Sequence, residues 1–445
     1  MAGYEVTKPV LDAPLPNEAE PPLTVDLDGT VLKTNLAIET LLTLLKQKPL
    51  CLFMLPFWRL KGKSLWQMLT ANGVELDVSA LPYRRELLNY LRAEHDRGRT
   101  IALRTAVNNA IAREVADYLG FVDWVLPSDG VPQTDRVFPG NALRPFPVDE
   151  RLRKRQLSEF LKPLRLHHWL KNLLLFVPLL AAHRYTDVQL IAKAVLAFIA
   201  FGICASGGYV LNDLLDLAAD RHHPKKRLRA FAAGELPLSY GLVIVPVVLV
   251  LASIIALTLP HQFLAMLWLY FALTLTYSLY VRRIVVLDVI LLAGLYTMRI
   301  MAGSAAVGLW PSQWLLAFST FLFLSLALVK RYSDLVIMRR VDGDQAKTRG
   351  YQRSDQELLA AMGIGSGYVS VLVLALYVDS NAAHNLYGRT ELIWFLCPLL
   401  LYWVSRMWLF AHRGKMPEDP LVFAMRDRVS QILTALMGVV LVLAL

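Results

Sequence analysis

Residues 212–237 have the sequence NDLLDLAADRHHPKKRLRAFAAGELP, and we name this segment the aspartate loop. It lies between two apolar stretches, LIAKAVLAFIAFGICASGGYVL at 190–211 and LSYGLVIVPVVLVLASIIALTL at 238–259. Each stretch is as long as the roughly 20 apolar residues that cross the hydrocarbon core of a bilayer. Within the loop, three aspartates are followed by two histidines and five Lys or Arg residues. The sequence therefore predicts two membrane helices joined by a highly charged connection.

The composition of the whole chain favours an integral membrane protein. Of its 445 residues, 56% are hydrophobic and 18% are charged, whereas soluble domains have about 25% charged residues. The net charge of +10 does not indicate nucleic-acid binding, because basic residues in membrane proteins mark the cytoplasmic loops. Cys51, Cys204 and Cys397 lie far apart, which argues against a disulfide framework or a cysteine metal site. The N-terminus lacks an apolar h-region, so we expect no cleaved signal peptide.

We expect three regions along the chain. Residues 1–150 have the pattern of a small soluble α/β domain. Residues 151–171 are expected to form a basic amphipathic linker helix at the membrane surface, with a solvated linker as the alternative. Residues 172–445 are expected to form an all-α polytopic membrane domain of about nine transmembrane helices. The candidate spans lie at 172–183, 190–211, 238–259, 262–280, 284–304, 312–329, 358–378, 391–411 and 429–445.

The basic residues between these spans predict how the chain is oriented. Segments on the side of the aspartate loop hold 26 Lys and Arg residues, whereas the opposite connections hold little besides Arg184 and Arg389. The positive-inside rule therefore places the N-terminus and the aspartate loop in the cytoplasm, and an odd number of spans places the C-terminus outside. The expected location is the inner membrane of a bacterial cell.

The polar side chains at the start of the aspartate loop have helical spacing. Asn212, Asp216 and Asp220 are four residues apart and Asp213 precedes Asp216 by three, so on a helix they share one face. Such closely spaced oxygen ligands repel each other unless a cation lies between them, and Mg²⁺ prefers carboxylates together with phosphate oxygens. The following Lys and Arg residues suit an anion. We therefore expect a metal-bound diphosphate at the cytoplasmic mouth of a helical bundle, with an ordinary solvated loop as the alternative.

Other spans place ionisable residues on the same side of the membrane. Asp288 begins an apolar span, and Arg299 lies eleven residues further along it. An ionisable group in such a span is costly unless it is paired, so both are functional-site candidates, with a purely structural pairing as the alternative. Lys330, Arg331 and Asp334 end another span, where a snorkelling interfacial cluster is the alternative for the two basic residues. Asp419 and Asp427 are expected to be loop and cap residues.

At these residues the chain resembles a known family. The aspartate loop resembles the NDxxDxxxD motif of the UbiA prenyltransferase superfamily, whose members are helical, intramembrane and Mg²⁺-dependent. Its continuation is similar to the HPxKxxR pattern of one branch, the decaprenyl-phosphate phosphoribosyltransferases. RLHHWLKN, YSLYVRRIVVLDV and KRYSDL also resemble this branch, in its RPxQWxKN, YSxxLKxxxxxDV and KRxxEL patterns. The departures, Ala230, Leu166 and His168, bear on substrate choice and remove no predicted metal ligand.

The resemblance implies a reaction and the residues that perform it. Phosphoribose would pass from Mg²⁺-bound phosphoribosyl diphosphate to a polyprenyl phosphate that enters from the bilayer, in a glycosyltransferase reaction that releases diphosphate. Asp213, Asp216 and Asp288 would be the catalytic residues. The metal ligands would be Asn212, Asp213, Asp216, Asp220, Asp288 and Asp334. The substrate-binding residues would be Lys171, Asn172, His223, Lys226, Arg229, Tyr277, Arg282, Arg299, Lys330 and Arg331.

Three other functions use the same features differently. A prenyltransferase would move a prenyl group from a prenyl diphosphate to an aromatic acceptor with the same aspartates. A transporter or flippase would use the carboxylates for ion coupling, but we find no inverted repeat, and the charges gather at one face of the membrane instead of its midplane. A membrane-anchored binding protein with two degenerate domains is the remaining alternative.

The N-terminal region resembles haloacid dehalogenase-like phosphatases. LTVDLDGTVLKTN matches their first motif, which implies that Asp26 is a nucleophile and Asp28 an acid/base. Residues 33–98 would be a helical cap insert, and TIALRTAVNN matches the second motif at Thr105. No Lys occurs between Ala106 and Glu150, and no strand with GDSxxD follows. We therefore expect a truncated domain whose phosphatase activity is weak or absent.

Overall fold

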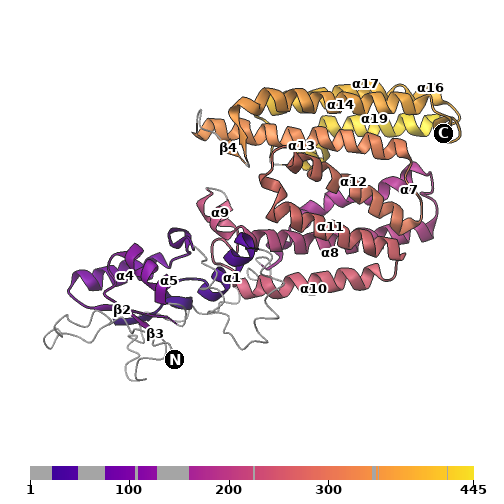
Figure 1. Cartoon of the computed structure of the whole chain (residues 1–445). Helices are drawn as coiled ribbons and strands as arrows, with labels where there is room; N and C mark the ends of the chain where they lie inside the picture. The colour runs from indigo at the N-terminus through magenta and orange to yellow at the C-terminus, as the bar shows by residue number, and fades with distance from the viewer. Residues whose placement is uncertain are drawn as a thin grey trace, which may run out of the picture. The chain divides into compact units, whose positions relative to one another are not determined.

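The computed structural model describes residues 23–48, 76–105, 109–127, 160–223, 226–342, 347–348, 350–417 and 419–445. These residues fall into two compact units, which we describe one at a time. The N-terminal unit comprises Met1–Phe160 together with Leu214–Ser239, and the membrane unit comprises Leu161–Asp213 and Tyr240–Leu445. Figure 1 shows the elements of both units with the labels used below. Most of the aspartate loop thus packs with the N-terminal residues.

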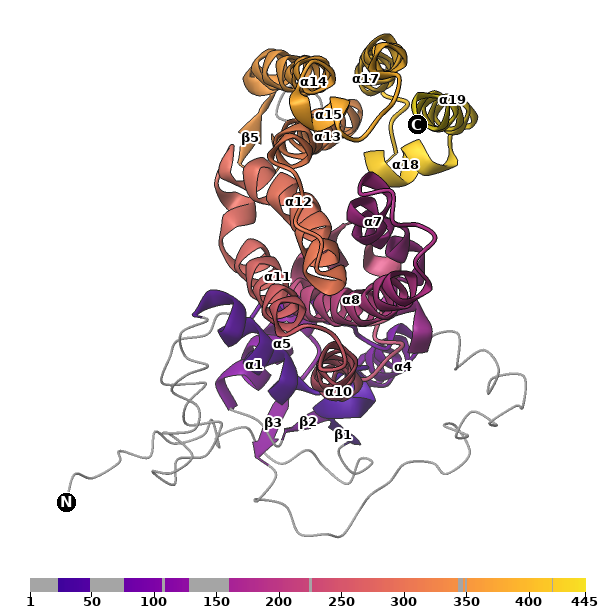
Figure 2. The same ribbon diagram turned by 90° about the vertical axis from the view of Figure 1, so that its right-hand side faces the viewer.

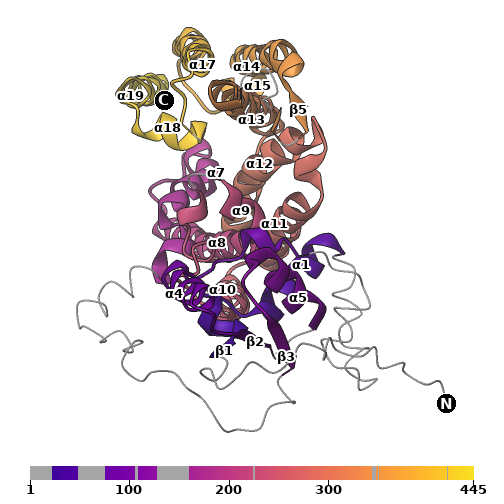
Figure 3. The same cartoon turned by 90° about the vertical axis from the view of Figure 1, so that its left-hand side faces the viewer.

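The N-terminal unit is built on a parallel sheet of three strands. The strands β1 (Leu23–Asp26), β2 (Ile101–Thr105) and β3 (Trp124–Pro127) lie in the order β1-β2-β3 (Figure 3). Parallel strands need long crossover connections, and these carry the helices α1 (Leu36–Gln47), α4 (Arg85–Asp96) and α5 (Asn109–Leu119). The core of the unit consists of apolar side chains from the strands and helices, among them Val25, Leu36, Leu91, Leu103 and Val115. The expected α/β fold of this region is confirmed.

The aspartate loop contributes two short elements to the same unit. These are α9 (Leu217–His222) and the 3-10 turn η5 (Lys226–Leu228). Phe231 and Leu236 of the loop are buried. The loop is therefore a folded part of the N-terminal unit.

The membrane unit is a bundle of long apolar helices (Figure 2). Neighbours in sequence are also neighbours in space, since α12 packs against both α11 and α13, and α14 against α13 and α17. The long helices are α8 (Val188–Leu215), α10 (Leu238–Ala256), α11 (His261–Leu279), α12 (Leu287–Val307), α13 (Gln313–Asp342), α14 (Gln356–Val378), α17 (Leu396–His412) and α19 (Arg428–Ala444). The shorter elements are η3 (Lys162–Leu164), η4 (Leu166–Phe176), α7 (Val177–Ala181), η6 (Val281–Arg283), β4 (Lys347–Thr348), β5 (Tyr351–Gln352), η8 (Arg353–Asp355), α15 (Asn381–His384), α16 (Thr390–Ile393) and α18 (Pro420–Arg426).

The outward faces of these helices are apolar, as a lipid environment requires. Along α10, Val243, Val247, Val250 and Ile254 expose more than half of their surface. A contiguous apolar face of this kind marks a membrane or interaction surface. In a helix all backbone groups are satisfied within the segment, so only the side chains meet the lipid. Together with the length and hydropathy of the helices, this makes the chain a multi-pass membrane protein.

The number of spans is smaller than the nine expected. Among the described residues, seven helices are long and apolar enough to cross a membrane, or eight if the bent pair of α18 and α19 is one span. The segment predicted as the first span, 172–183, consists of the end of η4 and the five-residue helix α7. Residues 151–159 of the predicted linker helix (151–171) lie outside the described residues. Phe160 and Leu161 are helical, and the chain then forms 3-10 turns interrupted at Arg165, which has a φ of 49°.

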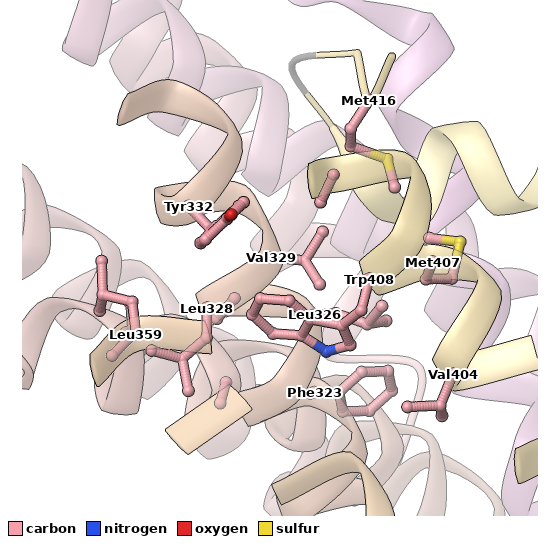
Figure 4. Close-up of a cluster of buried hydrophobic side chains, with 14 of the residues drawn as sticks. Phe323, Leu326, Leu328, Val329, Tyr332, Leu359, Val404, Met407, Trp408 and Met416 are labelled. Atoms are coloured by element: carbon pink, nitrogen blue, oxygen red, sulfur yellow. The ribbon is translucent and has the colours of Figure 1, made fainter. Parts of the chain in front are cut away.

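A glycine of α14 lies against an indole in the core between α13, α14 and α17. The indole of Trp408 packs among Phe323, Leu328 and Tyr332 (Figure 4), and its Nε1 donates to Ser325 Oγ at 3.0 Å. Ser325 in turn donates to the carbonyl oxygen of Gly363 at 2.7 Å. A Cβ on Gly363 would lie 2.0 Å from the Trp408 ring, so only glycine lets α14 approach the indole.

Gly363→Ala is therefore expected to destabilise the membrane unit by about 1–3 kcal/mol, the usual cost of overpacking a core. Gly365 is the matched control, because nothing lies within 4 Å of the Cβ it would gain, and alanine is the better helix former. Thermal unfolding in detergent measures both variants. A midpoint for Gly363→Ala that equals or exceeds that of Gly365→Ala contradicts this account of the core.

Candidate functional site

The aspartate loop starts on a helix that breaks within the motif. Helix α8 ends at Leu215, Asp216 lies at the break with φ −102° and ψ 11°, and α9 follows. Asn212 and Asp213 are thus on α8, whereas Asp220 is on α9. The expectation that these four residues share the face of one helix is wrong, because the chain turns at the second aspartate.

Each aspartate of the motif has a basic partner. Asp213 accepts from Arg165 Nη2 at 2.5 Å within the membrane unit. In the N-terminal unit, Asp216 accepts from Lys46 Nζ at 3.1 Å and Asp220 accepts from Arg229 Nη1 at 2.6 Å. All three carboxylates are buried. The mutual repulsion expected from their spacing is therefore relieved by basic side chains, two of which come from distant parts of the sequence.

Asp288 is at the centre of a buried polar cluster in the membrane unit. Its Oδ2 accepts from Arg331 Nε at 2.5 Å and its Oδ1 from the Tyr351 hydroxyl at 2.5 Å. Arg331 also donates to Asp334 Oδ2 at 3.0 Å and to the Tyr277 hydroxyl at 2.7 Å. The side chains of Asp288 and Arg331 are fully buried. Four residues predicted for the site thus meet here, and both oxygens of Asp288 are engaged.

Arg299 lies in the interior of the bundle with neutral partners. Its guanidinium donates to Asn172 Oδ1 at 3.2 Å, to the Tyr270 hydroxyl at 2.7 Å and to the carbonyl oxygen of Leu295 at 2.6 Å. It also lies over the ring of Tyr296 at 5.3 Å. Asn172 and Arg299, which were predicted separately, are therefore in direct contact.

Lys171 forms an ion pair with a residue that sequence reasoning assigned another role. Its ammonium group contacts the carboxylate of Asp419. Burial opposes the ionisation of Asp419, but the nearby charges of Lys171 and Lys330 lower the pKa of this carboxyl below its ordinary value. Asp419 and Asp427 also cap α18 and α19, as expected. The role of Asp419 as a charge partner was missed, although a buried lysine signals that some carboxylate must lie nearby.

Of the remaining predicted substrate-binding residues, His223, Lys226 and Arg282 lie in or next to short elements, whereas Lys330 is on the long helix α13. His223 follows α9, and its Nδ1 accepts from the backbone N–H of Lys226 at 3.3 Å. Lys226 begins η5, and Arg282 is half-buried in η6. Lys330 is half-buried on α13, beside the cluster around Asp288.

The convergence of the predicted metal ligands stays a prediction, because Asp213, Asp288 and Asp334 belong to one unit and Asp216 and Asp220 to the other. Among the described residues, no three His, Cys, Asp or Glu side chains lie together as the ligands of one metal ion. The donor chemistry nevertheless suits Mg²⁺, which takes hard oxygen ligands from one or two carboxylates and completes its shell with phosphate and water. The assignment of individual metal ligands remains a prediction.

The phosphatase-like motif of the N-terminal unit is altered by a neighbouring arginine. Asp26 ends β1 beside Arg104 of β2, which donates to Asp26 Oδ1 at 2.5 Å and to Oδ2 at 2.8 Å. Burial raises the pKa of Asp28, although its Oδ1 accepts from the backbone N–H of Leu36 at 2.7 Å. Thr105 is buried at the end of β2. The oxygens expected to attack a phosphate are thus already bound by a guanidinium.

The fold and these motifs can be compared with known proteins. Residues 173–427 match the UbiA prenyltransferase family, and the chain belongs to this family. It is 32% identical to the uncharacterized protein y4nM of Sinorhizobium fredii, over 95% of this chain and 91% of that protein. It is 30% identical to the decaprenyl-phosphate phosphoribosyltransferase of Mycobacterium tuberculosis, over 61% of this chain and 89% of that enzyme.

Solved structures include a UbiA homolog from Archaeoglobus fulgidus bound to DMAPP and Mg²⁺. It aligns with 64% of this chain and 99% of its own length, at 17% identity and a TM-score of 0.48.

Proposed function

We propose that this UbiA-family protein transfers phosphoribose from phosphoribosyl diphosphate to a polyprenyl phosphate, with Mg²⁺ as the cofactor. The observation that carries the proposal is the sequence of the aspartate loop. In this loop the NDxxDxxxD motif is followed by an HPxKxxR pattern, formed by His223, Lys226 and Arg229. This pattern resembles that of the phosphoribosyltransferase branch. The 30% identity to a decaprenyl-phosphate phosphoribosyltransferase over 89% of that enzyme supports the same branch.

The proposed reaction exchanges one bond at the anomeric carbon. A phosphate oxygen of the lipid attacks C1 of the ribose, the bond from C1 to the diphosphate oxygen breaks, and diphosphate leaves with the electron pair. Bound Mg²⁺ supplies positive charge that stabilises the leaving diphosphate. No nucleophile from the protein is required, so positioning and charge stabilisation account for the catalysis.

The proposal assigns the basic residues to two anionic substrates. Arg229 and Lys226 of the aspartate loop suit the phosphates of phosphoribosyl diphosphate, because arginine binds phosphate in a bidentate manner. Asp213 and Asp216 are the proposed metal ligands. Lys46 Nζ lies 3.1 Å from Asp216 Oδ1, so a metal ion that binds at this oxygen would displace Lys46. Lys171 and Arg299 are buried in the bundle and suit the phosphate of the lipid.

We place the aspartate loop and the N-terminal domain in the cytoplasm of a bacterial cell, with the bundle in the inner membrane. The excess of Lys and Arg on the side of the loop supports this orientation through the positive-inside rule. A cytoplasmic loop also has direct access to phosphoribosyl diphosphate, which is a soluble and highly charged substrate.

The experiment that tests the proposal supplies membranes containing the full chain with two labelled donors in turn. With labelled phosphoribosyl diphosphate and a polyprenyl phosphate, we expect label to enter the lipid fraction in a manner that requires Mg²⁺. Label that passes only from a prenyl diphosphate to an aromatic acceptor would overturn the proposal and establish the alternative prenyltransferase.

The N-terminal domain is proposed to lack phosphatase activity. We expect the purified full-length protein with Mg²⁺ to hydrolyse a generic phosphomonoester no faster than its Asp26→Asn variant does, because Arg104 binds both oxygens of Asp26. Release of inorganic phosphate measures the rate. Turnover in the wild type that is absent from Asp26→Asn would show that the domain is an active phosphatase.

A further inference from the structure

The N-terminal domain and the aspartate loop are joined by a buried ion pair. Arg221 of α9 donates from Nη2 to Glu39 Oε1 at 2.5 Å and from Nη1 to Glu39 Oε2 at 3.2 Å. Glu39 lies on α1, and the side chains of the two residues are 4% and 8% exposed. Arg221 Nε also donates to the carbonyl oxygen of Ala232 at 3.0 Å. One guanidinium thus connects α1 to both halves of the loop.

Three further contacts link the same two parts of the chain. His222 lies 2.7 Å from Asp77 Oδ2, and Lys46 of α1 lies 3.1 Å from Asp216 Oδ1. Gly234 packs so closely that a Cβ would lie 2.8 Å from Cβ of Lys33. The loop is therefore held at its beginning, at α9 and near its end by residues that lie more than a hundred positions earlier in the sequence.

These contacts bear directly on the proposed diphosphate site. Arg221 directly follows Asp220 on α9, and Asp216 is the N-cap residue of the same helix. Fixing α9 therefore fixes the two aspartates relative to each other. Misplacement of a reacting group by about 1 Å can lower a rate by about 10²-fold, so the geometry of this loop is a sensitive point of the reaction.

We propose that the N-terminal domain acts as a clamp on the aspartate loop, with Glu39 as the positioning residue that holds α9 through Arg221. The proposal rests on the assignment of the loop to diphosphate binding. It gives the domain a function that needs no phosphatase chemistry, in keeping with the pairing of Asp26 and Arg104. The domain serves the membrane reaction by ordering this segment.

The test uses Glu39→Gln in the full chain, with Glu94→Gln as the matched control. Glu94 is a buried glutamate of the same unit that pairs with Arg97 at 2.6 Å and Arg99 at 3.3 Å, away from the loop. We expect trypsin to cut after Arg221, Arg227 or Arg229 about tenfold faster in Glu39→Gln, because cleavage follows the population of the opened loop. The control is expected to leave this rate unchanged.

Transfer of label to lipid is measured on the same samples. We expect Glu39→Gln to raise the KM for the diphosphate donor and to lower kcat/KM by about 10–10²-fold, whereas Glu94→Gln leaves both near wild type. The exchanged pair, Glu39→Arg with Arg221→Glu, is expected to restore resistance to trypsin at Arg227 and Arg229, together with part of the activity.

Two results would overturn the clamp. One is equal tryptic cleavage of the loop in Glu39→Gln and Glu94→Gln, and the other is faster cleavage with unchanged transfer. Failure of the proposed function gives a different pattern, in which the wild type uses a prenyl diphosphate as donor. In that case the cleavage rates still show whether Glu39 holds the loop. The transfer rates of wild type, Glu39→Gln and Glu94→Gln are then measured with the prenyl diphosphate as donor.

Discussion

Asp213→Asn is expected to lower the transfer of phosphoribose to lipid by about 10²–10³-fold, the usual effect of removing one group that stabilises charge at a reacting centre. Asp213 ends the apolar part of α8, is buried, and accepts from Arg165 at 2.5 Å. Asparagine retains the shape of the side chain but removes the negative charge that is proposed to bind a metal ion. Formation of labelled lipid in membranes at increasing Mg²⁺ concentration measures the effect.

Asp427→Asn is the control for this loss. Asp427 also pairs with an arginine, since Arg406 donates to its two oxygens at 2.6 and 3.0 Å, but it caps α19 outside the motifs. We expect the control to keep its helix cap, because asparagine caps a helix as well as aspartate does, and to retain its transfer rate. Equal losses of transfer in the two variants would mean that Asp213 acts only through its ion pair.

Arg331→Met is expected to lower the free energy of unfolding by about 3–5 kcal/mol, because it leaves a buried carboxylate without its charge partner. Arg331 is fully buried and contacts Asp288, Asp334 and Tyr277. Methionine fills much of the same volume, so the loss arises from the uncompensated charge of Asp288. Thermal unfolding of the purified protein in detergent measures the change.

The double variant Arg331→Met with Asp288→Asn separates charge from packing. Asparagine removes the negative charge and still accepts a hydrogen bond from Tyr351, which now reaches Asp288 at 2.5 Å. We expect the double variant to unfold at a higher temperature than Arg331→Met alone. If it is less stable than the single variant, the cluster is held by packing and hydrogen bonds instead of by charge pairing.

Much of the architecture follows from local patterns. The apolar stretches around the aspartate loop are long enough to cross a bilayer whatever they pack against, and α8 and α10 lie where these stretches predicted them. The strand ending at Asp26 and the strand ending at Thr105 were also recognisable, since short apolar runs bounded by turn residues indicate buried strands. The segment 172–183 was too short for its length to predict a membrane span.

The partners of the charged residues could not be predicted from local sequence patterns. The sequence shows that Lys171, Arg299 and Asp288 are too costly in an apolar span to remain unpaired. It does not show that their partners are Asp419, Asn172 and Arg331, because any of several polar residues at the same depth would satisfy the requirement. The break of the helix at Asp216 was missed for a related reason, as helical spacing is also compatible with two helices that meet at a turn.

The sequence by itself determined that this is a membrane protein that resembles the UbiA family, with carboxylates and basic residues concentrated in one loop. These properties depend on hydropathy and spacing along the chain, and both can be counted without knowing the fold. Only the tertiary structure decided which basic side chain neutralises each carboxylate, and that α1 holds the aspartate loop through Glu39 and Arg221. Pairing between residues 182 positions apart depends on how the chain returns to itself, and no local pattern encodes that distance.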